Sequence, residues 1–342
     1  MATTTAPVPY ADVLEIGRLN SAFAQSRILS SAVDVGLFEL LDQAPADAEA
    51  VATRLGLDPR LVPDFLRALT ALGLVERVED AYRNSPRAAA CLVPGRPYYL
   101  GASVRATAAR HYAAWARLTD ALRGTAPADE GRGPDAFARL YEQPDLARRF
   151  LAHMDSAHAL VGPQLAEVVD WSKYASFVDV GGARGHIASV LVQSHPHLTG
   201  AVFELPAVEP FFHEYAAETG TADKLEFHGG DFFTDPLPQA DVLIYGHVLH
   251  DWTAPRRAFL LELAFKTLRP GGALVVYDQM LDDEEPALGA ALGSLQVALA
   301  TGGSEYLVAE GRAQVEEAGF VIEDGRRIRT TGNDYVLVAV KP

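Results

Sequence analysis

Residues 177–206, with the sequence FVDVGGARGHIASVLVQSHPHLTGAVFELP, constrain the fold more than any other stretch. The segment reads as a buried strand, a glycine-rich turn, a helix and a second strand that ends in Glu204. A glycine-rich turn lets a ligand approach the backbone closely, because a Cβ atom would obstruct it. An acidic residue about twenty positions further on is placed to accept hydrogen bonds from a ribose hydroxyl group. The pattern predicts a site for an adenosine-containing cofactor.

From residue 177 onward, strand-like runs alternate with helical stretches. The runs are FVDVG, GAVFEL, LEFHGGD, DVLIYG and ALVVYD. This alternation is typical of a doubly wound parallel α/β sheet. The chain closes with FVIEDGRRIR and YVLVAVKP, which we expect to form an antiparallel pair at the C-terminal edge of that sheet.

The first hundred residues follow a different pattern. Residues 13–42 have amphipathic helical spacing, and helices are expected at 47–54 and 58–72 with a hairpin from Val75 to Arg83. This winged-helix order suggests DNA binding. However, residues 1–100 hold nine Arg and no Lys against twelve acidic residues, a net charge of −3, and the whole chain carries −16. Binding to phosphates needs clustered positive charge, so we expect a packing or dimerisation role for this region and no nucleic-acid partner.

Composition supports a folded enzyme of more than one domain. The 342 residues are 49% hydrophobic, and Cys91 is the single cysteine, which excludes an intrachain disulfide. The N-terminal MATTTAPVPY lacks a signal-peptide pattern and no apolar run is long enough to span a membrane, so a cytoplasmic location is expected. We expect a winged-helix-like domain over 1–105, a helical segment over 106–165 and a cofactor-binding domain over 166–342. The loop at 124–137 is rich in Gly, Pro and Asp, as at a domain edge.

The residues of the turn narrow the choice of cofactor. A nicotinamide or flavin fingerprint is G-x-G-x-x-G, whereas the small residues after Asp179 fall as G-x-A-x-G. An acid two residues before the first glycine suits a cationic ligand such as S-adenosylmethionine, which has a sulfonium and an amino group. Asp231, after the third strand, is placed to accept from an adenine amino group, and Phe232 to lie on the ring face.

Six motifs in order resemble the S-adenosylmethionine-dependent O-methyltransferases of plants and of bacterial natural-product pathways. They are DVGGARG, FELP, GGDFF, LHDW, LRPGGALVVYD and GGSE. The resemblance covers nearly the whole chain. It implies a Rossmann-like class I methyltransferase sheet, a homodimer formed through the N-terminal domain, S-adenosylmethionine as cofactor and a small aromatic or enolic acceptor.

The resemblance also implies roles for individual residues. His250 would be the general base, because histidine accepts protons near neutral pH, and Asp278 or Glu305 would fix its tautomer. Acceptor contacts are expected at Phe150, Met154 and His247, although Phe150 and Met154 also read as ordinary helix core. Cofactor contacts are expected at Asp179, Gly181, Gly182, Gly185, Glu204, Leu205, Gly230, Asp231, Phe232, Gly246 and Trp252.

The chain departs from the family pattern at four positions. Ala183 and Arg184 replace the usual Gly and Thr of the turn, Gly246 stands where a basic residue often occurs, and Tyr306 follows Glu305 where Arg is common. The Tyr306 change removes an expected support of Glu305.

Other readings stay open at this point. Within the family the acceptor atom can be carbon or nitrogen, and from other classes a winged-helix ligand-sensing regulator or a nicotinamide oxidoreductase competes. His247, His250 and Asp251 are close enough in sequence to bind a metal, but the further ligands that such a site needs are not evident, so no metal is predicted.

Overall fold

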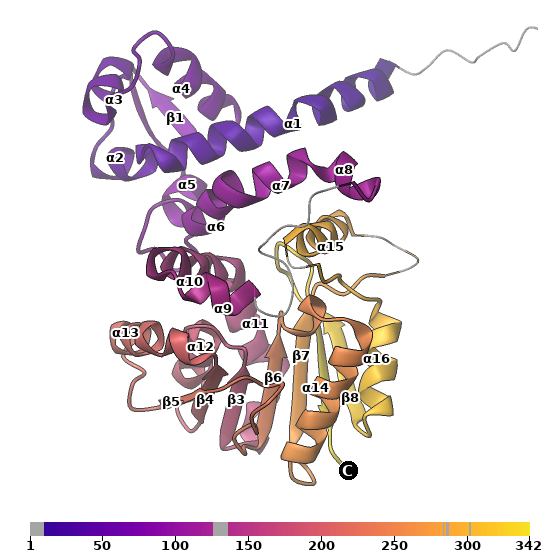
Figure 1. The fold of residues 1–342 in the computed structure, drawn as a ribbon. Coiled ribbons are helices and arrows are strands. Elements are labelled where there is room, and N and C mark those ends of the chain that lie inside the picture. The colour runs from indigo at the N-terminus through magenta and orange to yellow at the C-terminus, as the bar shows by residue number, and fades with distance from the viewer. Residues whose placement is uncertain (1–9, 126–135, 283, 285–286, 301) are drawn as a thin grey trace, which may run out of the picture. The chain divides into compact units, whose positions relative to one another are not determined.

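The computed structural model describes residues 10–125, 136–282, 284, 287–300 and 302–342 (Figure 1). Residues 1–9, and residues 126–135 of the loop expected at 124–137, lie outside the described part. The contacts divide the chain into two compact units between Ala109 and Arg110, close to the boundary expected at residue 105. Among the described residues, no helix is both long and apolar enough to cross a membrane.

The first unit is helical with one small hairpin. Its elements are α1 (Tyr10–Asp34), α2 (Leu37–Gln43), α3 (Ala48–Leu55), α4 (Val62–Ala71), β1 (Val75–Val78), β2 (Ala81–Asn84), α5 (Pro86–Cys91) and α6 (Gly101–Ala106). The helical pattern of 13–42 is therefore two helices, because Gly36 adopts a φ of 74° between them. The two helices and the hairpin that follow appear in the predicted order. The α4 helix begins later than predicted, with Asp58 accepting from the Arg60 N–H in the turn before it.

The second unit is built on a seven-stranded sheet in the order β5-β4-β3-β6-β7-β9-β8. Its strands are β3 (Ser176–Val180), β4 (Thr199–Glu204), β5 (Leu225–Gly229), β6 (Val242–Gly246), β7 (Ala273–Asp278), β8 (Val321–Arg327) and β9 (Tyr335–Val340). Strands β3 to β7 are parallel, and β9 is antiparallel to both β7 and β8. The doubly wound α/β sheet and its antiparallel C-terminal pair are thus confirmed. Within this pair, the last strand of the chain, β9, lies inside the sheet between β7 and β8, and β8 forms the edge.

The second unit contains ten α-helices among its described residues. They are α7 (Tyr112–Ala116), α8 (Leu118–Leu122), α9 (Ala136–Tyr141), α10 (Pro144–His158), α11 (Val161–Val168), α12 (His186–Ser194), α13 (Glu209–Thr219), α14 (Ala254–Thr267), α15 (Leu288–Ala300) and α16 (Val308–Glu317). The chain also contains a π-helix, η1 (Thr107–His111), and the short 3₁₀ helices η2 (Trp171–Lys173), η3 (Pro206–Val208) and η4 (Leu249–Asp251).

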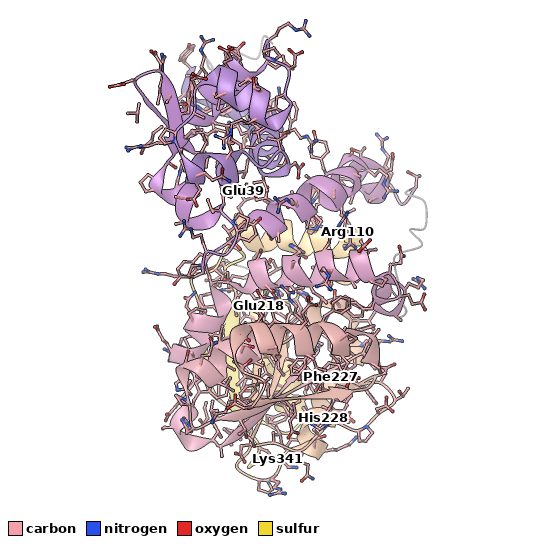
Figure 2. All side chains as sticks on the ribbon, turned by 90° about the vertical axis from the view of Figure 1, so that its left-hand side faces the viewer. Glu39, Arg110, Glu218, Phe227, His228 and Lys341 are labelled. Carbon is pink, nitrogen blue, oxygen red and sulfur yellow. The ribbon has the colours of Figure 1, made fainter. Side chains whose placement is uncertain are left out.

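Two hydrophobic clusters hold the layers together. On one face α11, α12 and α13 pack against the strands, and on the other α14 and α16 do so. At the edge, Phe227 and His228 lie on β5 (Figure 2). Between β3 and β6 the strand order changes direction, and the carboxyl ends of strands at such a point form the usual ligand crevice of open α/β sheets.

Candidate active site

The glycine turn begins where β3 ends. Gly181 and Gly185 adopt φ values of 73° and 87°, which favour glycine. A Cβ atom on Gly182 would lie 2.6 Å from the carboxyl carbon of Asp179. The Asp179 side chain is 2% exposed, and its Oδ2 has no hydrogen-bond partner among the described residues. Burial, together with the charge of Glu204, raises the pKa of Asp179 to about 7. A buried carboxylate without a partner is a site for a cationic ligand group.

Glu204 closes the turn from the neighbouring strand. Its Oε2 accepts from the Ala183 N–H at 3.2 Å and its Oε1 from the Leu205 N–H at 2.8 Å. Burial raises the pKa of Glu204 to about 7, although these two N–H groups lower it. The carboxylate is thereby fixed at the end of β4, beside the glycine turn. A carboxylate has room for further hydrogen bonds beyond these two.

A cluster of three aromatic side chains lies in the turns that follow strands β5 and β6. The rings of Phe232 and Trp252 lie 6.0 Å apart at 88°, and those of Phe233 and Trp252 lie 4.7 Å apart at 83°. Asp231 accepts from the Phe233 N–H at 2.9 Å, which fixes its carboxylate in the turn. Gly230 N–H donates to the Glu204 carbonyl at 2.9 Å and links this turn to β4. The turns after β3, β4, β5 and β6 therefore bring the expected cofactor residues to one end of the sheet.

Gly246 has a packing reason to be glycine. A Cβ atom at this position would overlap the ring of Tyr277, which is 1% exposed. A larger side chain at position 246 would therefore require the buried ring of Tyr277 to move.

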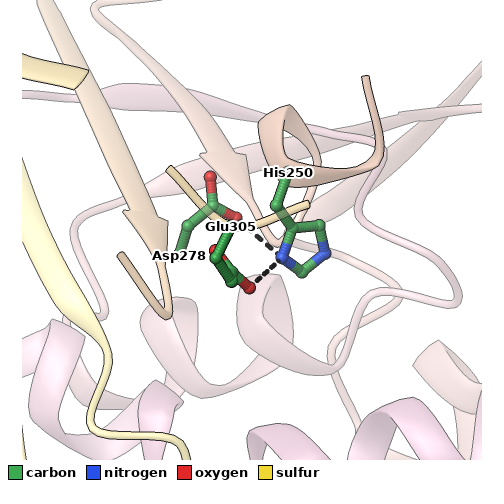
Figure 3. A group of neighbouring side chains, drawn as sticks. All are labelled: His250, Asp278 and Glu305. Carbon is green, nitrogen blue, oxygen red and sulfur yellow. Dashed lines mark hydrogen bonds and ion pairs between the residues drawn. The ribbon is translucent and has the colours of Figure 1, made fainter. Parts of the chain in front are cut away.

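His250 lies in a buried cluster with two carboxylates (Figure 3). Its Nδ1 is 2.6 Å from Oε1 of Glu305 and 3.5 Å from Oδ1 of Asp278. All three residues are less than 9% exposed. Figure 3 shows the other ring nitrogen pointing away from both carboxylates. A Glu305 carboxylate on Nδ1 keeps a proton on that nitrogen, so that the ring, when neutral, carries its lone pair on Nε2.

The two carboxylates of this cluster have different surroundings. Tyr306 donates its hydroxyl to Oδ2 of Asp278 at 2.7 Å, so the tyrosine expected to weaken the site supports it through Asp278. Burial raises the pKa of Asp278 to about 7. Burial lowers the pKa of His250, but the charges of Glu305 and Asp278 raise it by more. The pKa of His250 therefore lies well above its ordinary value.

His247 is held on both sides of its ring. Its Nε2 lies 2.5 Å from Oδ1 of Asp334, and its Nδ1 lies 3.2 Å from Nε2 of His158. With both nitrogens engaged, the ring has none left for a metal ion or for a direct hydrogen bond to an acceptor. Ligand atoms of His250, Asp278 and Glu305 lie within 4.8 Å of one another, but Nδ1 of His250 is already bonded to Glu305.

The comparisons with known proteins decide the family. The O-methyltransferase domain model matches residues 115–321, and the O-methyltransferase dimerisation domain model matches residues 18–94. The chain belongs to the O-methyltransferase family. Methyl transfer from S-adenosylmethionine is therefore the activity of this enzyme, and S-adenosylmethionine is its cofactor.

Two curated relatives and one solved structure illustrate the match. The N,N-dimethyltransferase OxyT of Streptomyces rimosus is 46% identical over 343 residues, covering 99% of this chain and 100% of that protein. The tetracenomycin polyketide synthesis 8-O-methyl transferase TcmO of Streptomyces glaucescens is 44% identical, covering 96% of each chain. Human N-acetylserotonin methyltransferase in complex with SAM superposes with a TM-score of 0.86 at 26% identity, covering 100% of this chain and 99% of that one.

In this O-methyltransferase the helix α10 carries the residues expected to meet the acceptor. Phe150 is half-buried, with its ring 6.1 Å from the rings of both Phe137 and Tyr141. Met154 is half-buried one turn further along. Packing among neighbouring aromatic side chains is thus part of the role of Phe150, whichever acceptor binds.

Four contacts of this enzyme were not found from the sequence, two of Arg184 and two of His247. Arg184 donates from Nε to Oδ2 of Asp155 at 2.7 Å, and its guanidinium lies 4.6 Å above the Tyr215 ring. The pair is about 15% exposed and ties the glycine turn to α10. The other two contacts are those of His247 with Asp334 and His158. Arg184 was the one signal visible in advance, as an unusual residue in the turn.

Proposed function

We propose that the enzyme transfers a methyl group to a hydroxyl group of a small aromatic or enolic metabolite, with His250 as the general base. The observation that carries this proposal is the buried His250, with Glu305 on one ring nitrogen and the other directed away from the carboxylates (Figure 3). A phenol is mostly protonated at neutral pH, so removal of its proton during transfer is worth roughly 10²–10⁴-fold in rate.

Glu305 and Asp278 support this step by their charge. As His250 takes up the proton, the imidazolium gains the interaction with Glu305 at 2.6 Å and with Asp278 at 3.5 Å. Both carboxylates are buried, where charge interactions are stronger than in water. The Tyr306 hydroxyl holds Asp278 in place.

We assign cofactor binding to the turns at the carboxyl ends of β3 to β6. S-adenosylmethionine supplies an electrophilic methyl group when bound. The unpaired Asp179 fits its amino group, Glu204 fits the ribose hydroxyl groups, and Asp231 with the Phe232 ring fits the adenine. The remaining contacts proposed are those of Gly181, Gly182, Gly185, Leu205, Gly230, Gly246 and Trp252.

The similarity to OxyT and TcmO supports an acceptor from natural-product biosynthesis. Phe150 and Met154 on α10 provide apolar surface for its ring. The name of OxyT favours a second candidate, methylation of an amine nitrogen, because that relative is an N,N-dimethyltransferase.

A labelled-methyl transfer screen distinguishes the two. The enzyme is incubated with S-adenosylmethionine labelled in its methyl group and with panels of phenols, enols, keto acids and amines. We expect the label on a hydroxyl oxygen of a polycyclic phenol or enol, located by mass spectrometry and NMR. Transfer confined to amines would refute the hydroxyl acceptor and support the second candidate. A reaction that contains the labelled donor and the acceptor but no enzyme serves as the blank.

We further propose that the enzyme is a homodimer formed through the first unit, because the dimerisation domain model matches there. The first half of α1 exposes a row of large apolar side chains, more than a monomer's surface usually carries. They are Tyr10, Val13, Leu14, Ile16, Leu19 and Phe23.

Light scattering tests the dimer. We expect the mass of two chains, and a shift toward one chain when Ile16 and Leu19 are both replaced by Asp, since charges would then lie in the buried interface. Val321→Asp, at an exposed apolar residue of the second unit, should leave the mass unchanged. A double variant that stays dimeric would contradict the assigned surface.

A further inference from the structure

A largely buried ion pair connects the glycine turn to the helix α10. Arg184 of the turn donates from Nε to Oδ2 of Asp155 at 2.7 Å, and its Nη2 donates to the same oxygen. The two side chains are 16% and 15% exposed. Hydrogen bonds between two charged groups are stronger than neutral ones, and burial reduces their screening by water and salt. The pair therefore holds the turn and the helix in one arrangement.

A tyrosine on α13 also holds Arg184. The guanidinium carbon lies 4.6 Å from the centre of the Tyr215 ring, whose face attracts a cation. The Tyr215 hydroxyl lies 2.9 Å from Nδ1 of His186, the first residue of the helix that follows the turn. The arginine and the start of α12 thus contact the same side chain. This contact limits the freedom of Arg184 to move away from Asp155.

The helix α10 has a second connection, to the segment that carries the proposed base. His158 follows Asp155 by three residues, which places both side chains on one face of the helix. Nε2 of His158 lies 3.2 Å from Nδ1 of His247, three residues before His250. Asp155 thus connects α10 to the cofactor turn, and His158 connects it to the segment of the base. Met154, proposed to contact the acceptor, is next to Asp155 in the chain.

We propose that Arg184 and Asp155 are positioning residues for methyl transfer. Their ion pair sets the place of α10, and with it the place of the acceptor, relative to the methyl donor in the glycine turn. In-line transfer needs the acceptor atom aligned with the methyl carbon and the sulfur, and a misplacement of about 1 Å can cost roughly a hundredfold in rate. The inference rests on the proposed function, which assigns the turn to the cofactor and α10 to the acceptor.

The first test needs no acceptor. Hydrogen exchange of the full chain is measured with and without S-adenosylhomocysteine, the product formed from the donor. We expect this ligand to slow amide exchange in the turn and, through the ion pair, about tenfold at residues 152–158 of α10. Asp155→Asn keeps the size of the side chain and removes its charge. In this variant the slowing in the turn should remain, and the slowing in α10 should be mostly lost.

Arg148→Ala is the matched control. Arg148 lies on the same helix and pairs with Glu214 of α13 at 2.8 Å, with the two side chains 53% and 54% exposed. Because this pair joins α10 to α13 and leaves the turn out, its loss should preserve the slowing in α10. Arg184→Gln removes the charge of the other partner, should behave as Asp155→Asn does, and carries the test if Asp155→Asn does not fold.

The exchange data can overturn the inference in two ways. Slowing in α10 that is unchanged in Asp155→Asn and Arg184→Gln, or lost equally in Arg148→Ala, would show that the ion pair does not link the two elements. Ligand binding that slows no exchange in the turn of the wild type would instead refute the cofactor assignment on which the inference rests.

Turnover gives an independent measurement with the acceptor found by the methyl-transfer screen. Asp155→Asn and Arg184→Gln should each lower kcat about tenfold to a hundredfold, and Asp155→Asn should leave the KM of S-adenosylmethionine within about threefold. The double variant should lose no more than either single variant, because the two residues act as a unit. A double loss equal to the product of the single losses, or a raised donor KM with unchanged kcat, would contradict the positioning role.

Discussion

Replacement of His250 by alanine is expected to lower turnover about 10²–10⁴-fold while leaving the affinity for S-adenosylmethionine unchanged. The reason is that the imidazole, fixed by Glu305 at 2.6 Å, would no longer take the proton of the acceptor. Single-turnover kinetics with the acceptor found by the methyl-transfer screen measure the rate, and calorimetry measures cofactor binding.

His213→Ala is the matched control. His213 lies on α13 with 64% of its side chain exposed, so loss of this imidazole should not change the rate. Full turnover in His250→Ala would mean that the acceptor arrives already deprotonated or that another residue removes its proton. A rate that falls together with cofactor affinity would instead place His250 in the cofactor site.

Replacement of Asp179 by asparagine is expected to weaken S-adenosylmethionine binding about tenfold to a hundredfold, because a charge-assisted hydrogen bond is lost. Without cofactor the same variant should be the more stable protein at pH 8. The folded-state pKa of Asp179 is about 7 against an ordinary value of 3.8, so the folded state binds more protons than the unfolded state between these values. The ionised carboxylate therefore reduces stability progressively as pH rises from about 4 to about 7, and asparagine removes that loss.

Thermal unfolding at pH 5 and pH 8, with and without S-adenosylmethionine, measures both effects. The melting temperature of the free variant should exceed that of the wild type by a few degrees at pH 8 and by less at pH 5. The increase that the cofactor causes should be much smaller in the variant. Asp64→Asn, on an 81% exposed side chain, is the control. An undiminished cofactor effect in Asp179→Asn would exclude this carboxylate from the cofactor site.

The sequence predicted those features that depend on local pattern. Alternating apolar runs gave the strands, and glycine with acid at fixed spacing gave the turn of Asp179 and the carboxylate of Glu204. The fold and the cofactor are confirmed, whereas the individual site residues stay predictions that the geometry supports. The break at Gly36 was missed because an apolar pattern continues through it on both sides.

What could not be predicted depends on residues far apart in the chain. His247 and Asp334 are 87 positions apart, and nothing in the local sequence of either indicates the other. Arg184 was noticed as unusual, but its partner Asp155 lies on a helix whose placement only the fold provides. Tyr306 was expected to weaken the site because the sequence cannot show that its hydroxyl reaches Asp278.

The close packing of Gly246 on Tyr277 limits how this enzyme can evolve. A larger residue at position 246 would force its side chain into the buried ring of Tyr277. The smaller ring or aliphatic side chain needed at 277 would in turn leave a cavity while Gly246 remained. Each single substitution is therefore unfavourable, and a larger residue at 246 is accommodated only together with a smaller one at 277, so that each of the two positions restricts what selection can do at the other.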